Sequence, residues 1–69
     1  MSEIIFEVLD DPECGLRARA LGHSIYTQGA DMDELKSMIR DAVRLYFEHA
    51  DERPSLIRLH YVREEVIAA

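Results

Sequence analysis

The sequence holds few of the residues that build disulfides, metal sites or phosphate loops. Its 69 residues include one cysteine, three glycines, two prolines and no tryptophan. A single Cys14 excludes an internal disulfide and, with no second cysteine, a metal site of the usual spacing. Gly15, Gly22 and Gly29 form neither a G-x-G-x-x-G pattern nor a Walker motif. We therefore expect no cofactor and no metal, and a reducing compartment.

Long apolar runs are also missing. No stretch approaches the roughly 18 to 20 apolar residues that span a bilayer. The N-terminal sequence MSEIIFE lacks the basic and apolar regions of a signal peptide. The sequence therefore predicts a cytoplasmic protein without membrane contact.

Positive charge is scarce. Eight basic residues stand against fourteen acidic ones, which gives a formal net charge of −6. Binding to nucleic acid depends on Lys and Arg that neutralise phosphates, so we expect no direct nucleic-acid binding. The acidic excess lies mainly at the N-terminus and suits a basic protein partner. Its members are Glu3, Glu7, Asp10, Asp11 and Glu13.

Size and composition indicate one folded domain over residues 1–69. Hydrophobic residues make up 48% and charged residues 32% of the chain, as in globular proteins and unlike disordered ones. At this length burial only just offsets the conformational entropy lost on folding. Self-association would add buried surface, so we expect a homo-oligomer, most simply a dimer.

Alternating apolar residues predict three antiparallel strands in a meander. Residues 4–9 form the first strand, and an Asp, Pro and Gly cluster at 10–15 forms a turn. Residues 16–21 form the second strand, and residues 24–27 form the third after a reversal at Gly22. The side chains expected to face the core are Ile4, Phe6, Val8, Leu16, Ala18 and Ala20.

A helix is predicted from Met32 to His49. Asp31 is the expected N-cap, and Glu34 is expected to reach back as in a capping box. Apolar residues recur at helical spacing and form one stripe toward the sheet. That stripe consists of Leu35, Ile39, Ala42, Val43 and Tyr46.

A fourth strand over residues 56–62 follows Pro54, with Ile57, Leu59 and Tyr61 facing the helix. The sequence leaves its direction open, and it leaves residues 66–69 to extend the strand, dock on a neighbouring subunit or fray. The predicted fold class is α+β in the order β-β-β-α-β: a three-stranded antiparallel meander plus a fourth strand, with one helix packed on one face.

Met38 and Leu45 widen the helical stripe on one edge, and Phe47 widens it on the other. This apolar arc is broader than one small sheet covers. Either it is a contact surface for a partner, or the strands and the C-terminal segment enclose it.

Catalysis and RNA binding are the rival interpretations. Paired carboxylates at Asp10 and Asp11 are able to shift each other's pKa, which would suit a small-ligand or catalytic role. Turn aspartates are usually solvated, so we expect no enzyme. Arginines on one sheet face would form either an RNA-binding patch or a solvated face crossed by Glu7 and Glu65. These arginines are Arg17, Arg19, Arg58 and Arg63.

The segment CGLRARALG at 14–22, followed by TQGADMDEL at 27–35 and Ala42-Val43, resembles the HicB antitoxin family. In that family a glycine turn leads a strand, a later strand ends in Thr and Gly, and a capped helix follows. The resemblance covers roughly residues 3–50. It implies a partial ribonuclease-H-like fold and a role in neutralising a small basic RNA-cleaving toxin.

Two departures from that family stand out. The Pro-Asp-Leu-Pro-Gly stretch usual between the second and third strands is shortened here to Leu21-Gly22-His23. No helix-turn-helix or ribbon-helix-helix region follows, so we expect a solitary domain that does not regulate itself through DNA. The expected toxin contact is the acidic edge around Asp10, Asp11 and Glu13.

Overall fold

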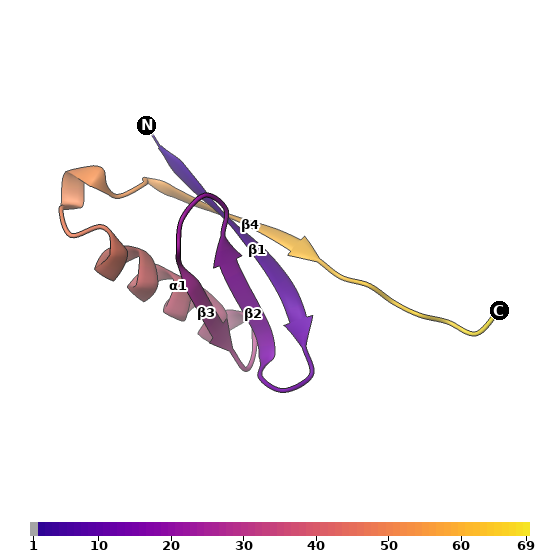
Figure 1. The fold of residues 1–69 in the computed structure, drawn as a ribbon. Coiled ribbons are helices and arrows are strands. Elements are labelled where there is room, and N and C mark those ends of the chain that lie inside the picture. The colour runs from indigo at the N-terminus through magenta and orange to yellow at the C-terminus, as the bar shows by residue number, and fades with distance from the viewer. Residues whose placement is uncertain (1) are drawn as a thin grey trace.

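The computed structural model describes residues 2–69 as one helix packed on a four-stranded sheet (Figure 1). In chain order the elements are β1 (Glu3–Asp11), β2 (Gly15–Ala20), β3 (Tyr26–Gly29), α1 (Met32–Tyr46), a 3-10 turn (Ala50–Glu52) and β4 (Leu56–Val62). The sheet order is β3-β2-β1-β4. β2 pairs antiparallel with β1 and β3, whereas β4 pairs parallel with β1. The predicted α+β class is confirmed, and the open direction of the fourth strand is settled as parallel.

Strand alternation places the core where the sequence predicts it. Alternate residues of β1 as far as Val8, and of β2 throughout, are buried beneath α1, whose own buried residues recur at helical spacing. Phe6, Val8 and Leu35 have no exposed surface. The full core consists of Ile4, Phe6, Val8, Leu16, Ala18, Ala20, Ile25, Leu35, Ile39 and Val43.

Gly15 and Gly29 have structural roles that require the absence of a side chain. Gly15 has a φ of +97°, and a Cβ there would lie 2.5 Å from the carbonyl oxygen of Ala30. A Cβ on Gly29 would lie 2.6 Å from the backbone nitrogen of Leu35. These positions need glycine because the start of β2 lies against the backbone of Ala30, and the end of β3 lies against the backbone of Leu35 in α1.

The predicted N-cap of α1 is confirmed. Asp31 Oδ1 accepts a hydrogen bond from the Glu34 amide at 2.8 Å, and Glu34 Oε1 accepts one from the Ala30 amide at 2.6 Å. The helix ends at Tyr46, however, so the predicted end at His49 was wrong. Arg53 causes the early end because its guanidinium donates to the carbonyl of Phe47 at 3.0 Å and to that of Arg44 at 3.3 Å.

The third strand also lies later than predicted, at Tyr26–Gly29 instead of 24–27. Ile25 is buried, and its carbonyl accepts a bond from the Ala20 amide at 3.0 Å, which closes the reversal. Tyr46, predicted in the core, is 45% exposed. Its ring packs edge-on against His23 and Phe47 at the end of the helix.

The β4 side of the sheet is less covered. None of its seven residues is buried, although Ile57 and Leu59 partly pack on the core. α1 packs mainly on β3 and β2. Residues 63–69 continue away from the domain as an extended, exposed segment (Figure 1).

Candidate binding site

Asp10 is tied to the β4 side of the sheet. The Tyr61 hydroxyl donates to Asp10 Oδ1 at 2.7 Å, and Arg63 Nε donates to Oδ2 at 3.1 Å. Arg63 also bonds to the Tyr61 oxygen at 2.7 Å and lies over its ring. The hydrogen bond from Tyr61 and then that from Arg63 lower the pKa of Asp10. Tyr61 lies on the predicted face of the sheet, level with Val8, but it is 38% exposed and binds this carboxylate instead of packing on the core.

Asp11 is tied to its own turn. Its Oδ1 accepts bonds from the backbone amides of Glu13 at 2.8 Å and Cys14 at 3.3 Å, and Arg17 lies 3.4 Å from Oδ2. The two amides lower the pKa of Asp11. Partial burial, and then the charge of Asp11, raise the pKa of Cys14, so its thiol is not activated as a nucleophile.

Asp10 and Asp11 do not form a catalytic pair. Successive side chains of a strand point to opposite faces, and the partners agree: Tyr61 holds Asp10 on the helix side, whereas Arg17 holds Asp11 on the open face. Both carboxylates stay ionised and bound. A general base needs a pKa near the working pH, which these lowered values oppose.

Glu13 and Met38, two residues singled out in the sequence, lie on one hollow. This acidic hollow, about 430 Å³, lies between the β1–β2 turn, the end of β3 and the start of α1. Glu34 joins them on its wall, and no basic side chain lines it. Met38 is 44% exposed. The structure thus combines two carboxylates with a flexible apolar side chain.

The other two residues of the predicted apolar arc lie elsewhere. Leu45 is 82% exposed and stands apart from the acidic hollow. Phe47 is partly buried on the core, with its ring edge-on to His23 and Tyr46. The arc is therefore not one continuous surface.

The four arginines of the suggested RNA patch all carry carboxylate partners. The shortest of these ion pairs joins Arg58 Nη2 and Glu3 Oε1 at 2.9 Å. Arg63 shares the helix-side network of Asp10, so it does not join the others on the open face. The other pairs are Arg17–Asp11, Arg19–Glu7 and Arg63–Asp10. The open face is therefore crossed by alternating charge.

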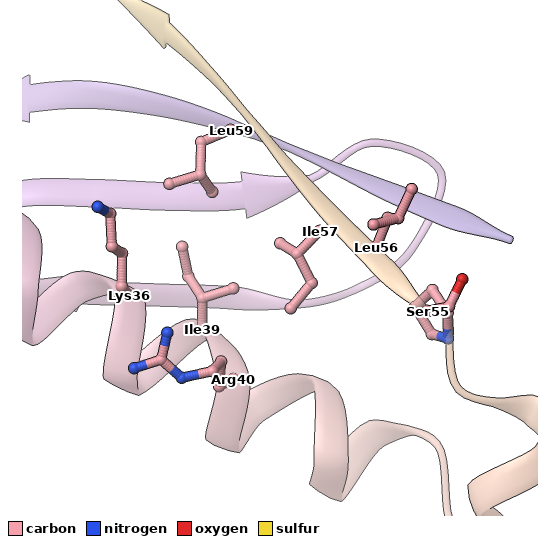
Figure 2. A pocket seen from close by; sticks show the side chains of 8 residues that line it. Lys36, Ile39, Arg40, Ser55, Leu56, Ile57 and Leu59 are labelled. Atoms are coloured by element: carbon pink, nitrogen blue, oxygen red, sulfur yellow. The ribbon is translucent and has the colours of Figure 1, made fainter.

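A second hollow was not predicted. It is a groove of about 340 Å³ between α1 and the start of β4. Figure 2 shows Ile57 and Leu59 pointing from β4 toward Ile39, beside the side chains of Lys36 and Arg40. We call it the basic groove. The sequence signal for this groove is the i, i+4 spacing of Lys36 and Arg40, which places both cations on one face of the helix but does not show that β4 lies beside them.

No metal centre or membrane span emerges from residues 2–69. Within that range no three His, Cys, Asp or Glu side chains gather where an ion would bind. The described helices are also too short or too polar to cross a bilayer.

Comparison with known proteins gives two relatives. A UPF0150 protein of Archaeoglobus fulgidus is 49% identical over 53 residues, which is 77% of each chain. A UPF0150 protein of Thermotoga maritima is 32% identical over 66 residues, covering 96% of this chain and 91% of the relative. No family model and no solved structure matches. Both relatives match most of their own length, so the chain belongs to the UPF0150 family.

Proposed function

We propose that this chain is a cytoplasmic protein-binding module of the HicB antitoxin kind, which neutralises a small basic RNA-cleaving toxin. The observation that carries the proposal is the acidic hollow formed by Glu13, Glu34 and Met38. The hollow receives a basic side chain of the toxin.

The chemistry of the hollow suits a lysine or arginine. Within residues 2–69 the Glu13 carboxylate makes no ion pair or hydrogen bond, so it is available to a guanidinium or ammonium group. The long aliphatic part of such a side chain would pack on Met38, whose thioether adapts to varied shapes. Charge-assisted hydrogen bonds to carboxylate are about twice as strong as neutral ones.

Asp10 and Asp11 act at longer range. Both carry their own partners, so neither is free to bind a toxin side chain directly. Their carboxylates still add to the negative field, and a net charge of −6 speeds encounter with a basic protein. In this proposal Glu13 makes the contact and the aspartates shape its setting.

The HicB-like residues support the same assignment. Gly15 lets the end of the β1–β2 turn lie against Ala30, and Gly29 lets the end of β3 lie against Leu35 in α1; the acidic hollow lies between these segments. The segment that resembles the antitoxin family is therefore the segment that builds the proposed contact.

The test first looks for a short basic open reading frame beside this gene and then uses the protein that it encodes. Co-expression should relieve the growth arrest caused by that protein, and the two should co-purify without detectable ribonuclease activity. Glu13→Lys and Met38→Lys should each weaken the complex about tenfold or more, because each places a like charge against the basic side chain.

Glu48→Lys is the matched control. It makes the same charge change on an exposed helix-end residue away from the hollow and should leave binding unchanged. Equal losses for Glu13→Lys and Glu48→Lys would reduce the effect to net charge and contradict the site. Absence of a short basic neighbour, together with no captured partner, would overturn the function.

A further inference from the structure

The chain exposes more surface than a monomer of its mass should. Its accessible surface is 5284 Å², against about 4,450 Å² for a compact protein of 8.0 kDa. The radius of gyration is 13.4 Å, against about 11 Å for a compact chain of 69 residues. The surplus of about 800 Å² is close to what each partner buries in a standard interface.

Residues 63–69 are all exposed and include two large apolar side chains. Val66 is 94% exposed and Ile67 is 78% exposed, directly after Glu64 and Glu65. An acidic pair followed by an apolar pair is unusual for a segment left in solvent. We expect this segment to bind a surface that has an apolar floor and basic residues along its edge.

The basic groove has those two properties. Ile57 and Leu59 form its floor, and Lys36 and Arg40 stand along its α1 side (Figure 2). Within the described chain neither of these cations forms an ion pair, and neither do Glu64 and Glu65. The segment and the groove are therefore complementary in charge and in hydrophobicity.

A chain cannot easily fill its own groove. The groove lies at the start of β4, and residues 63–69 leave from the end of β4. At about 3.3 Å per residue, Ile67 lies about 26 Å beyond Leu59 along the strand. Folding back would need a tight turn at Arg63-Glu64-Glu65, which holds none of the usual turn residues. The fitting occupant is a second copy.

We propose that two chains associate through antiparallel pairing of their β4 strands, with residues 63–67 of each lying along the basic groove of the other. β4 is an edge strand of the sheet, so its outer backbone groups have no partner strand in residues 2–69. Pairing two such edges satisfies them. It would join the two sheets into one of eight strands.

Alternation and the match of apolar and charged groups together select the register. A two-fold axis normal to the sheet pairs residues that point to the same face. Continued from β4, Glu65 and Ile67 lie on the helix side with Ile57 and Leu59. With Val62 at the axis, Ile67 of one copy lies opposite Ile57 of the other. Glu65 then lies opposite Leu59, beside Lys36. The apolar and charged groups match in this register.

The first test is the size of the full chain in solution. Sedimentation at low and high micromolar concentration should show a dimer. Ile67→Asp should give a monomer with an unchanged far-UV circular dichroism spectrum. Leu45→Asp, at an equally exposed apolar residue on the far side of α1, should remain dimeric.

A charge swap tests the contact itself. Lys36→Glu and Glu65→Lys should each raise the dimer dissociation constant about tenfold, because each puts like charges together at two symmetric sites. The double variant should restore the wild-type value. Single variants without effect, or a double variant worse than either, would overturn the contact.

Cross-linking tests the register. In a Cys14→Ser background, Val62→Cys should oxidise to a covalent dimer, because the two copies meet at the axis within disulfide distance. Leu45→Cys should cross-link far more slowly. A wild-type chain that stays monomeric, whether because residues 63–69 fold back or because they bind another protein, would overturn the proposal. Faster cross-linking at Leu45 would do the same.

Discussion

The sheet is well covered over β3, β2 and β1, which we call the packed side, and poorly covered along its β4 edge, which we call the β4 side. On one side α1 covers β3, β2 and the inner face of β1, and every buried residue comes from those elements or from Ile25 beside them. On the other side β4 has no buried residue, and residues 63–69 lie in solvent. One helix of fifteen residues is too narrow to cover four strands.

This difference separates stability from recognition. The packed side supplies the apolar burial that holds the fold, and the β4 side leaves apolar groups half covered, which the proposed dimer would bury. The acidic hollow lies on the packed side, and the basic groove lies on the β4 side. The acidic hollow is shaped by backbone contacts at Gly15 and Gly29, whereas flexible Lys36 and Arg40 line the basic groove.

The largest expected effect contrasts the two sides directly. Phe6→Ala removes a fully buried ring from the packed side and should cost about 3–5 kcal/mol. A domain of this length has a free energy of unfolding of about 3–10 kcal/mol, so this loss is a large part of it. Leu59→Ala, on the β4 side, should cost only about 1–2 kcal/mol because the side chain is half-buried. Urea unfolding at low protein concentration measures both.

Concentration sharpens this contrast. If β4 strands pair between copies, the cost of Leu59→Ala should grow as protein concentration rises, because the dimer buries that side chain. The cost of Phe6→Ala should stay constant. A large cost for Leu59→Ala that does not depend on concentration would mean that β4 is covered within one chain.

Gly29 and Gly22 are required for different reasons, and substitutions at these two positions should have smaller effects on stability. Gly29 has an ordinary φ, but a Cβ there meets the Leu35 backbone at 2.6 Å, so Gly29→Ala and Gly29→Asn should both cost about 1–3 kcal/mol. Gly22 has a φ of +85° and no atom within 4 Å of an added Cβ. Gly22→Ala should cost about 1–2 kcal/mol, and Gly22→Asn clearly less, since Asn tolerates that conformation. Thermal unfolding of the four variants tests this, and rescue by Asn at Gly29 would contradict it.

The sequence predicts the buried core better than the contacts between distant residues. Alternation and helical spacing identify nine of the ten core residues, and the limits of β4 are predicted as observed. Those patterns are local, and each follows from which side chains avoid water. The failures involve contacts between distant residues. Arg53 ends the helix early, and Asp10 draws Tyr61 and Arg63 into a network.

The candidate sites also depend on contacts between segments that are distant in the sequence. Glu13 and Met38 were both predicted, but their meeting on one hollow depends on how closely the β1–β2 turn approaches α1. The basic groove was missed because the position of β4 was open. Lys36 and Arg40 line a groove only when β4 lies beyond β1, parallel to it.

The smallest expected effect concerns the turn of the packed side. Backbone amides hold the pKa of Asp11 below its ordinary value near 3.8. A lowered folded-state pKa contributes stability that is present above the unfolded-state pKa and lost as pH falls through the folded-state pKa. Wild-type stability should therefore fall below about pH 4, and Asp11→Asn should reduce that slope while keeping an oxygen for the two amides. The variant should be slightly less stable at neutral pH, and the difference should vanish in acid. Urea unfolding across pH measures this, with exposed Glu48→Gln as the control; an unchanged slope in Asp11→Asn would show that its ion pair and amide bonds do not persist in solution.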